Sequence, residues 1–335
     1  IVTVKAALSP IGNNEVGRPG HLVSVNWDNV VIGGNSATYA VGAQSSSNVY
    51  STGSDTAANG VRSVRAYPTI DTTLGTGATQ LTDGSQKNLY RFSISAPTGG
   101  LGISLYKMTF NVATTGDDNV PTDVPITNIK LYASTGSNFS GDAYANNPVN
   151  NGTAFGSSDG ILDGAESDRA TTSDYAIYFN PSNSAAALGG QEAISIAAGQ
   201  TIYFALKGDV TGADASDKVS TRLMGDVSWY ACANTQGGTV AYDDAGFLAG
   251  SINYGFATTG PFVDNANAGS TGGGAVAAGL SNNDAGGAGD DFIWSGNSTT
   301  THSGASGTGG PDWYNGFQVP GLPSDGGNEQ ILIAS

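Results

Sequence analysis

Apolar residues recur at every second position in several short segments of this chain, and this spacing constrains the fold more than any other feature. In residues 89–95, one face of an extended strand would carry Tyr90, Phe92 and Ile94. In residues 104–112, the predicted inward set is Tyr106, Met108, Phe110 and Val112. A two-residue period is typical of β-strands that bury one face. The pattern therefore predicts strands, and no segment predicts a long helix.

Further segments with the same character extend the predicted sheet. They are residues 127–132, 175–179, 193–196 and 201–207, with weaker candidates at 1–8, 22–27, 30–32 and 38–41. Residues 193–207 are expected to form a hairpin-like unit, because Gly199 can supply the positive φ that its turn needs. Strands that end regularly at Gly, Asn, Asp or Pro favour an all-β sandwich with long Gly-rich loops and little or no helix. Its predicted core comprises Phe92, Met108, Phe110, Ile202, Phe204 and Leu206.

The composition narrows the possible functions. Glycine supplies 50 of the 335 residues, and 28 acidic side chains face 12 basic ones, for a net charge of −16. This balance argues against nucleic-acid partners, which need Lys and Arg clusters, and against anionic membrane surfaces. No stretch approaches the ~20 apolar residues of a membrane-spanning helix. An acidic surface fits cation binding and keeps a chain with few charges soluble.

The composition and the first residue favour a secreted protein. Ile1 stands where an initiator Met would be, so we expect a processed extracellular product whose signal has been removed. Cys232 is the only cysteine, which leaves no intrachain disulfide to stabilise the fold. We expect Cys232 to act as a small buried apolar residue, with a reactive thiol as the alternative.

Composition also divides the chain into three segments. Residues 1–60 hold weak strands and are too short for a core of their own, although they could donate a strand. Residues 61–232 hold the predicted core sandwich. Residues 233–335 are rich in Gly and aromatic residues, and we expect them to form β-structure that packs on the core or on neighbouring subunits.

The central and terminal motifs resemble one group of surface proteins. The central ones are Tyr90-Arg-Phe92, residues 105–110, residues 129–132, residues 196–201 and Gly208-Asp-Val210; the terminal ones are residues 291–295, 300–303, 312–316 and 319–323. Together they resemble the immunoglobulin-like β-sandwich surface proteins of uncultured ultra-small bacteria of the candidate phyla radiation. The resemblance implies an immunoglobulin-like sandwich and a place in the cell envelope. It implies no catalytic residues.

Catalytic motifs are poorly represented. His21 and His302 are the only histidines, too few for a three-His zinc site. Residues 304–308 depart from G-x-S-x-G at the last position, and no phosphate-binding glycine motif is complete. The sequence thus predicts a protein that is not an enzyme and requires no cofactor, with a secreted glycosidase as a remote alternative.

The acidic groups have two interpretations, a solvated acidic loop and a structural calcium site. Four carboxylates fall within ten residues at Asp159, Asp163, Glu166 and Asp168. Two further acidic groups are Asp117, Asp118 and Asp123, and Asp209, Asp214 and Asp217. Ca²⁺ prefers such oxygen ligands, but none of the groups matches an EF-hand loop, so a solvated acidic loop is the alternative. Three sequons, at Asn138, Asn151 and Asn297, are possible glycosylation sites or chance products of the composition.

The first residues form the last candidate site. Ile1, Val2, Val4 and Leu8 make residues 1–8 an apolar strand that ends at Ser9-Pro10. Such a strand can complete the sheet of a neighbouring subunit by donor-strand exchange, or it can pair within its own chain.

These observations favour an extracellular structural protein that polymerises with itself into a filament, tube or surface layer. The alternative is a carbohydrate-binding or adhesive module for cell-surface glycans. In that case Trp27, Trp229, Trp294 and Trp313 would supply an exposed stacking platform. Two coplanar exposed tryptophans would favour sugar binding, whereas buried tryptophans would favour assembly.

Overall fold

The computed structural model describes 21 stretches of the chain. They are residues 3–11, 15–17, 22–23, 25–27, 31–32, 35–36, 38–52, 56–57, 60–77, 80–116, 124–139, 148–149, 151–152, 158–163, 168–170, 173–178, 194–226, 231–232, 291–298, 313–323 and 326–335. Every regular element in them is a β-strand, and none of these residues is helical. The predicted all-β class is therefore confirmed. Among the described residues there is also no helix of the length and hydropathy needed to cross a membrane.

The smaller sheet of the body has four antiparallel strands. Its order is β12 (Ile126–Ser134), β18 (Thr201–Val210), β10 (Gly84–Ser95) and β9 (Thr69–Asp71). β10 and β18 are in register from Tyr90↔Leu206 to Ser95↔Thr201, which places Phe92 opposite Phe204. The two rings are stacked, with their centroids 5.0 Å apart.

The larger sheet has nine strands around β11 (Ile103–Thr115), which is long enough to pair with two partners along each edge. One edge pairs with β17 (Ile194–Ile196) and β16 (Asp174–Tyr178), and the other with β21 (Phe292–Ser295) and β19 (Lys218–Leu223). The sheet is completed by β15 (Asp168–Ala170), β20 (Ala231–Cys232), β22 (Trp313–Asn315) and β23 (Gln330–Ile333). Three of its strands thus come from the predicted 233–335 segment.

The core lies between the two sheets and closes them into a sandwich. Phe92 of the smaller sheet contacts Phe110 of the larger one, with ring centroids 5.8 Å apart. The predicted core residues Phe92, Met108, Phe110, Phe204 and Leu206 are fully buried, and Ile202 is partly buried against them. The predicted register of these strands is therefore correct.

One local prediction is wrong, and another is tested only in part. Residues 197–200 do form a turn, with Gly199 at φ 74° and the Gln200 N–H donating to the Ala197 carbonyl. The flanking strands are not a hairpin, because β17 bonds to β11 of the larger sheet whereas β18 bonds to β10 and β12 of the smaller. In β11, a register shift against β21 between Leu105 and Lys107 changes which residues face inward. Ile103 and Leu105 join the core before the shift, whereas the side chain of Tyr106 lies outside the described part.

A buried carboxylate fastens the C-terminal strands to the body. Asp226, just after β19, is 1% exposed and accepts hydrogen bonds from the backbone N–H groups of Asp291 (2.8 Å) and Gly316 (2.6 Å). These donors flank the start of β21 and the end of β22. Asp226 therefore links three segments that are far apart in the sequence.

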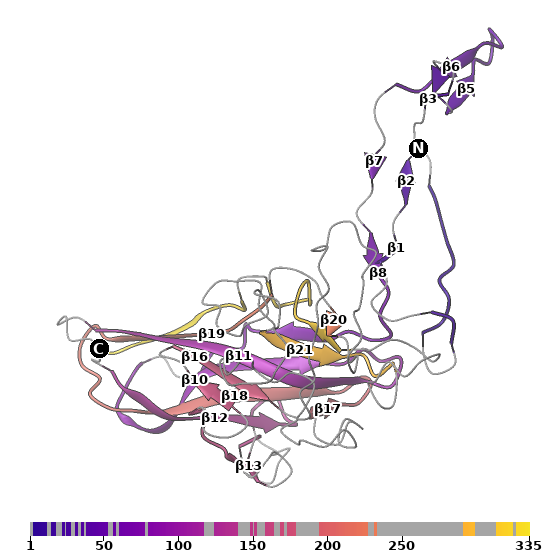
Figure 1. Ribbon diagram of the computed structural model, residues 1–335. Coiled ribbons are helices and arrows are strands. Elements are labelled where there is room, and N and C mark those ends of the chain that lie inside the picture. Colours follow the sequence, from indigo (N-terminus) through magenta and orange to yellow (C-terminus); the bar gives the residue numbers. More distant parts are fainter. Residues whose placement is uncertain are drawn as a thin grey trace, which may run out of the picture.

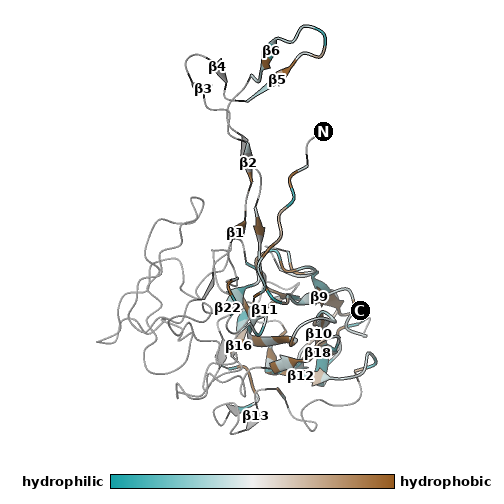
Figure 2. Cartoon of the chain, turned by 90° about the vertical axis from the view of Figure 1, so that its right-hand side faces the viewer, coloured by the Kyte–Doolittle hydropathy of each residue, from teal (hydrophilic) through white to brown (hydrophobic). Residues whose placement is uncertain are grey.

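A thin N-terminal arm projects from this body (Figures 1 and 2). We call residues 1–62 the arm. Its strands are β1 (Leu22–Val23), β2 (Asn26–Trp27), β3 (Val31–Ile32), β4 (Asn35–Ser36), β5 (Tyr39–Val41), β6 (Asn48–Tyr50), β7 (Thr56–Ala57) and β8 (Val61–Arg62). A further small pair, β13 (Asn151–Gly152) and β14 (Ser158–Asp159), lies at the opposite end of the body from the arm (Figure 2).

Candidate assembly arm

The part of the arm next to the body, which we call the stem, consists of two separate strand pairs, β1–β8 and β2–β7. β1 pairs with β8 through Leu22↔Arg62 and Val23↔Val61, and β2 pairs with β7 farther from the body. Each pair forms a separate two-stranded sheet. A single two-stranded sheet is at best marginally stable in water, because it has no second layer to bury its side chains. The stem therefore lacks the source of stability that the sandwich possesses.

The tip of the arm carries a better-formed hairpin. β5 and β6 pair through three residues each, and the Ser51 N–H extends the pairing by donating to the Thr38 carbonyl. Tyr39 and Tyr50 are opposite each other across the strands, with ring centroids 5.8 Å apart and planes tilted by 55°. Cross-strand aromatic pairs of this kind stabilise antiparallel sheets. Both rings nevertheless remain exposed.

Among the described residues, most of the large apolar side chains that are exposed lie on the arm. Eleven of the fifteen exposed large apolar side chains in the described residues belong to it: Val4, Leu8, Val16, Val23, Val25, Trp27, Tyr39, Val41, Val49, Tyr50 and Val61. Exposure reaches 85% for Val16 and 67% for Val61. None of the described arm residues belongs to the hydrophobic core. A soluble domain rarely leaves so many large apolar side chains exposed in one segment, and such a concentration favours an interaction site.

The arm also differs from the body in charge. Residues 1–62 contain three basic side chains, Lys5, Arg18 and Arg62, and three acidic ones, Glu15, Asp28 and Asp55. The whole net charge of −16 is consequently carried by residues 63–335. Two acidic bodies repel each other, whereas a neutral arm approaches an acidic body without this penalty.

The base of the arm is fixed to the sandwich. The Arg65 guanidinium donates to the Asn297 carbonyl at 3.3 Å, and Ala66 is buried. A Cβ added to Gly296 would lie 2.6 Å from the Ala66 carbonyl oxygen, so the close approach requires glycine there. The junction thus holds the arm at a defined place on the body.

The predicted N-terminal strand is only partly described. Residues 3–10 belong to no strand, and all of their side chains are exposed, including Val4 and Leu8. Pairing begins only at an isolated bridge between Ile11 and Gly17. Ile1 and Val2 lie outside the described residues. Pairing of residues 3–8 within their own chain is therefore not found, and pairing with a neighbour stays a prediction.

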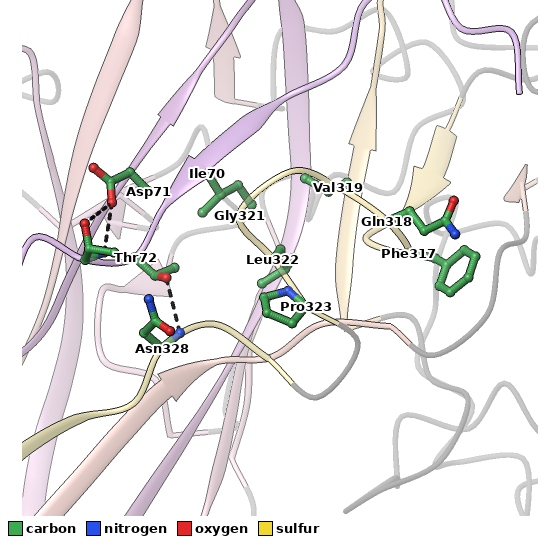
Figure 3. Close-up of a pocket in the computed structure, with 11 residues that line it drawn as sticks. Ile70, Asp71, Thr72, Phe317, Gln318, Val319, Gly321, Leu322, Pro323 and Asn328 are labelled. Atoms are coloured by element: carbon green, nitrogen blue, oxygen red, sulfur yellow. Dashed lines mark hydrogen bonds between the residues drawn. The ribbon is translucent and has the colours of Figure 1, made fainter. Parts of the chain in front are cut away.

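The body carries an open groove beside the edge strand β9. The groove has a volume of about 570 Å³ and is lined by Ile70, Asp71, Thr72, Thr73, Phe317, Gln318, Val319, Gly321, Leu322, Pro323 and Asn328 (Figure 3). Two backbone hydrogen bonds shape it, from Ile70 N–H to the Pro320 carbonyl and from Leu322 N–H to the Val319 carbonyl. Gly321 has φ 85°, and a Cβ there would overlap the Ile70 carbonyl oxygen. Asp71 is the only charged residue of the lining.

The predicted calcium ligands are not assembled in the described residues. Asp159 and Asp163 are exposed, and the Asp159 carboxylate accepts the Ile161 N–H at 2.8 Å. Glu166 and the side chain of Asp168 lie outside the described part, as do Asp117, Asp118 and Asp123. No group of three or more potential metal ligands occurs among the side chains that the structure places.

The carboxylates of the third acidic group serve the fold. Asp209 accepts hydrogen bonds from the Asn128 side chain (2.7 Å) and the Gln86 backbone (2.8 Å), and these bonds lower its pKa. Gln86 and Asn128 both have positive φ, at 52° and 50°, beside the irregular registers of β10 and β12. Asp217 accepts the Asp214 N–H at 2.8 Å in the turn before β19.

The predicted sequons differ in accessibility. Asn138 is exposed in the turn after β12. Asn297 is partly buried, and its side-chain oxygen accepts a hydrogen bond from the Ser104 hydroxyl at 2.8 Å. The side chain of Asn151 lies outside the described residues. Accessibility thus favours Asn138 over Asn297 as an acceptor.

The tryptophans with described side chains do not form a common platform. Trp27 is 48% exposed on the arm, whereas Trp294 is buried in β21, and its indole N–H donates to the Asn315 carbonyl at 2.9 Å. Trp229, the side chain of Trp313, His21 and His302 lie outside the described part, as does the side chain of Cys232. Trp294 therefore contributes to the core of the body.

Comparisons with known proteins provide no family for this chain. No protein-family model matches it, and no curated protein matches it. Functional inference therefore depends on the arm and the groove. The sequence did not predict the projecting arm or the groove, because neither feature depends on a sequence motif. The signals that could have indicated the arm were the charge balance of residues 1–62 and their apolar runs, which are too short for a core.

Proposed function

We propose that this protein is an extracellular structural subunit that polymerises with itself through its N-terminal arm. The observation that carries the proposal is the concentration of exposed apolar side chains on an arm that has no core of its own. Exposing these apolar side chains to water is unfavourable in free energy. Another molecule that covered the arm would remove this apolar surface from water.

A second copy of the chain is the partner that the charges favour. The arm is neutral and the body strongly acidic, so copies would associate by arm-to-body contacts better than by body-to-body contacts. The surface that donates differs from the surface that receives, so the contact is heterologous. Such a contact propagates into an open filament or tube when its rotation does not close a ring.

The proposed localisation follows from the resemblance of the sequence motifs. Their resemblance to immunoglobulin-like surface proteins of ultra-small bacteria supports a place outside the cell, in a filament, tube or surface layer. Bound Ca²⁺ at the 159–168 loop is an optional part of this proposal. Glycan binding is less well supported, because Trp294 is buried and the exposed Tyr39–Tyr50 pair is tilted rather than coplanar.

Sedimentation velocity over a range of protein concentrations tests the proposal. Replacing Val41, Val49 and Val61 together by Thr keeps the side-chain shape but removes apolar surface from the arm. We expect this variant to remain monomeric at concentrations at which the parent forms large species. The matched control replaces Leu101 and Ile331, two exposed apolar residues of the body, by Thr and should assemble like the parent. Equal assembly of the parent and the arm variant would overturn the proposal.

A further inference from the structure

The first residues of the arm and the groove beside β9 carry apolar side chains and opposite charges. We propose that residues 1–8 of one copy lie as an extended strand in the groove of a second copy. This inference rests on the proposed function, for which it specifies the contact. Residues 3–8 are suited to this role because they belong to no strand and expose every side chain.

The apolar surfaces of the two partners correspond. In an extended strand, alternate side chains lie on one face, which here gathers Val2, Val4, Ala6 and Leu8. The accessible apolar part of the groove comes from Pro323, which is exposed, and Phe317, which is half-buried. Ile70, Val319 and Leu322 lie beneath them and belong to the core of the sandwich. The volume of about 570 Å³ falls within the range of sites that hold ligands with several side-chain-sized groups. Recognition of a strand through alternate side chains is a known mode of peptide binding.

The charges favour one register. Lys5 is the only charged residue among the first ten, and Asp71 is the only charged residue of the groove. Lys5 and Asp71 are both exposed. An exposed ion pair contributes little affinity, but it selects the register of a strand that could otherwise slide by two residues.

Residues 3–8 do not lie in the groove of their own chain. Every side chain from residue 3 to residue 10 is exposed, so these residues do not fill the groove of their own body. The segment that follows the N label runs beside the stem, outside the sheets of the sandwich (Figure 2). Binding to a second copy also leaves that copy's own arm free to continue the chain, as an open polymer requires.

Disulfide trapping between two different variants tests the contact. Protein with Ala6→Cys is mixed with protein carrying Thr73→Cys or Asn328→Cys, all in a Cys232→Ala background and under mild oxidation. The control partner carries Ser137→Cys, an exposed residue in the turn after β12. A docked strand raises the effective concentration of its cysteine to the mM range, so at μM protein the groove variants should form the mixed dimer about 100-fold faster or more than the control.

The outcomes separate this inference from the proposed function. If the groove variants cross-link no faster than Ser137→Cys while the protein still assembles through its arm, the groove inference is wrong and the proposed function stands. If no assembly occurs at any concentration, both are wrong.

A second measurement uses charge reversal. Lys5→Asp should weaken assembly, and Lys5→Asp combined with Asp71→Lys should restore it; the absence of restoration would also count against the groove.

Discussion

The arm and the body of this protein are built from the same secondary structure but use it in opposite ways. In β10, every residue from Leu89 to Ser95 is buried or half-buried, whereas all three residues of β5 are exposed. The strands of the two large body sheets face each other across a shared core. The described strands of the arm occur in separate two-stranded pairs, and none of their residues joins that core. The comparison teaches that the number of packed layers, not strand formation, decides whether apolar side chains stabilise a fold or remain available for contacts.

This division makes the body the source of stability. Phe92 has no exposed surface and contacts Tyr90, Phe110 and Phe204. Phe92→Ala should lower the free energy of unfolding by about 3–5 kcal/mol, through lost burial and the cavity that remains. Chemical denaturation followed by near-ultraviolet circular dichroism measures the change. A loss below 1 kcal/mol would mean that the core is not located between the two sheets.

The second prediction concerns the link that holds β21 and β22 on the body. Asp226→Ala would leave the partly buried N–H of Asp291 and the buried N–H of Gly316 without their acceptor, at about 1–3 kcal/mol for each. We expect a loss of about 2–5 kcal/mol in the same denaturation experiment. Asp159→Ala removes an exposed carboxylate as the control and should cost much less. Similar losses in the two variants would show that Asp226 does not fasten the C-terminal strands.

A third prediction uses pH to separate buried from exposed tyrosines. Burial raises the pKa of Tyr90 to about 12, from an ordinary value of 10.0. Below pH 10 the phenol is protonated in both the folded and the unfolded chain, so its contribution is constant. Between pH 10 and 12 the unfolded chain loses the proton first, and stability falls by about 2–3 kcal/mol from this group.

The measurement compares denaturation midpoints of the parent and Tyr90→Phe from pH 8 to pH 12. The variant should lose less stability than the parent over the upper two units. Tyr39→Phe, on the exposed hairpin of the arm, serves as the control and should follow the parent curve. Parallel curves for all three proteins would mean that Tyr90 titrates as a solvated phenol.

The smallest effect on stability is expected in the arm itself. Val61→Ser changes a side chain that is 67% exposed, so the free energy of unfolding should move by less than about 0.5 kcal/mol. The same change should weaken association about tenfold, because burial of one valine in a contact contributes about 1.5 kcal/mol or more. Thermal unfolding measures the change in stability, and sedimentation velocity on the same sample measures the change in association. A large fall in stability would place Val61 in a core.

Much of the body could be predicted from local sequence. The alternation around Phe92 and Phe204 identifies the buried faces correctly, because a two-residue period leaves only one face that can be apolar throughout. The pairing of β17 and β18 could not be predicted in this way. A turn at Gly199 is compatible with a hairpin and with a crossing between sheets, and only distant strands decide between them. The shift in β11 after Leu105 likewise depends on β21, nearly 190 residues away.

The candidate site was less accessible to sequence reasoning. Residues 1–8 were identified as an apolar strand, but the groove is assembled from residues 70–73 and 317–328, which become neighbours only in the folded sandwich. For the acidic groups, the sequence suggests a ligand-binding role where the structure shows a role in the fold. Asp209 and Asp217 look like cation ligands in the sequence, yet in the structure they accept hydrogen bonds that hold irregular backbone in place.

We expect the arm to assemble the protein and the body to fold without it. Electron microscopy and sedimentation velocity of the full chain and of a variant that lacks residues 1–62 distinguish these two roles. The full chain should form polymers, and the variant should be a monomer with an unchanged near-ultraviolet spectrum and the same denaturation midpoint. Polymers formed equally well by the shortened chain would show that the arm does not drive assembly, and failure of this chain to fold would show that the body depends on the arm.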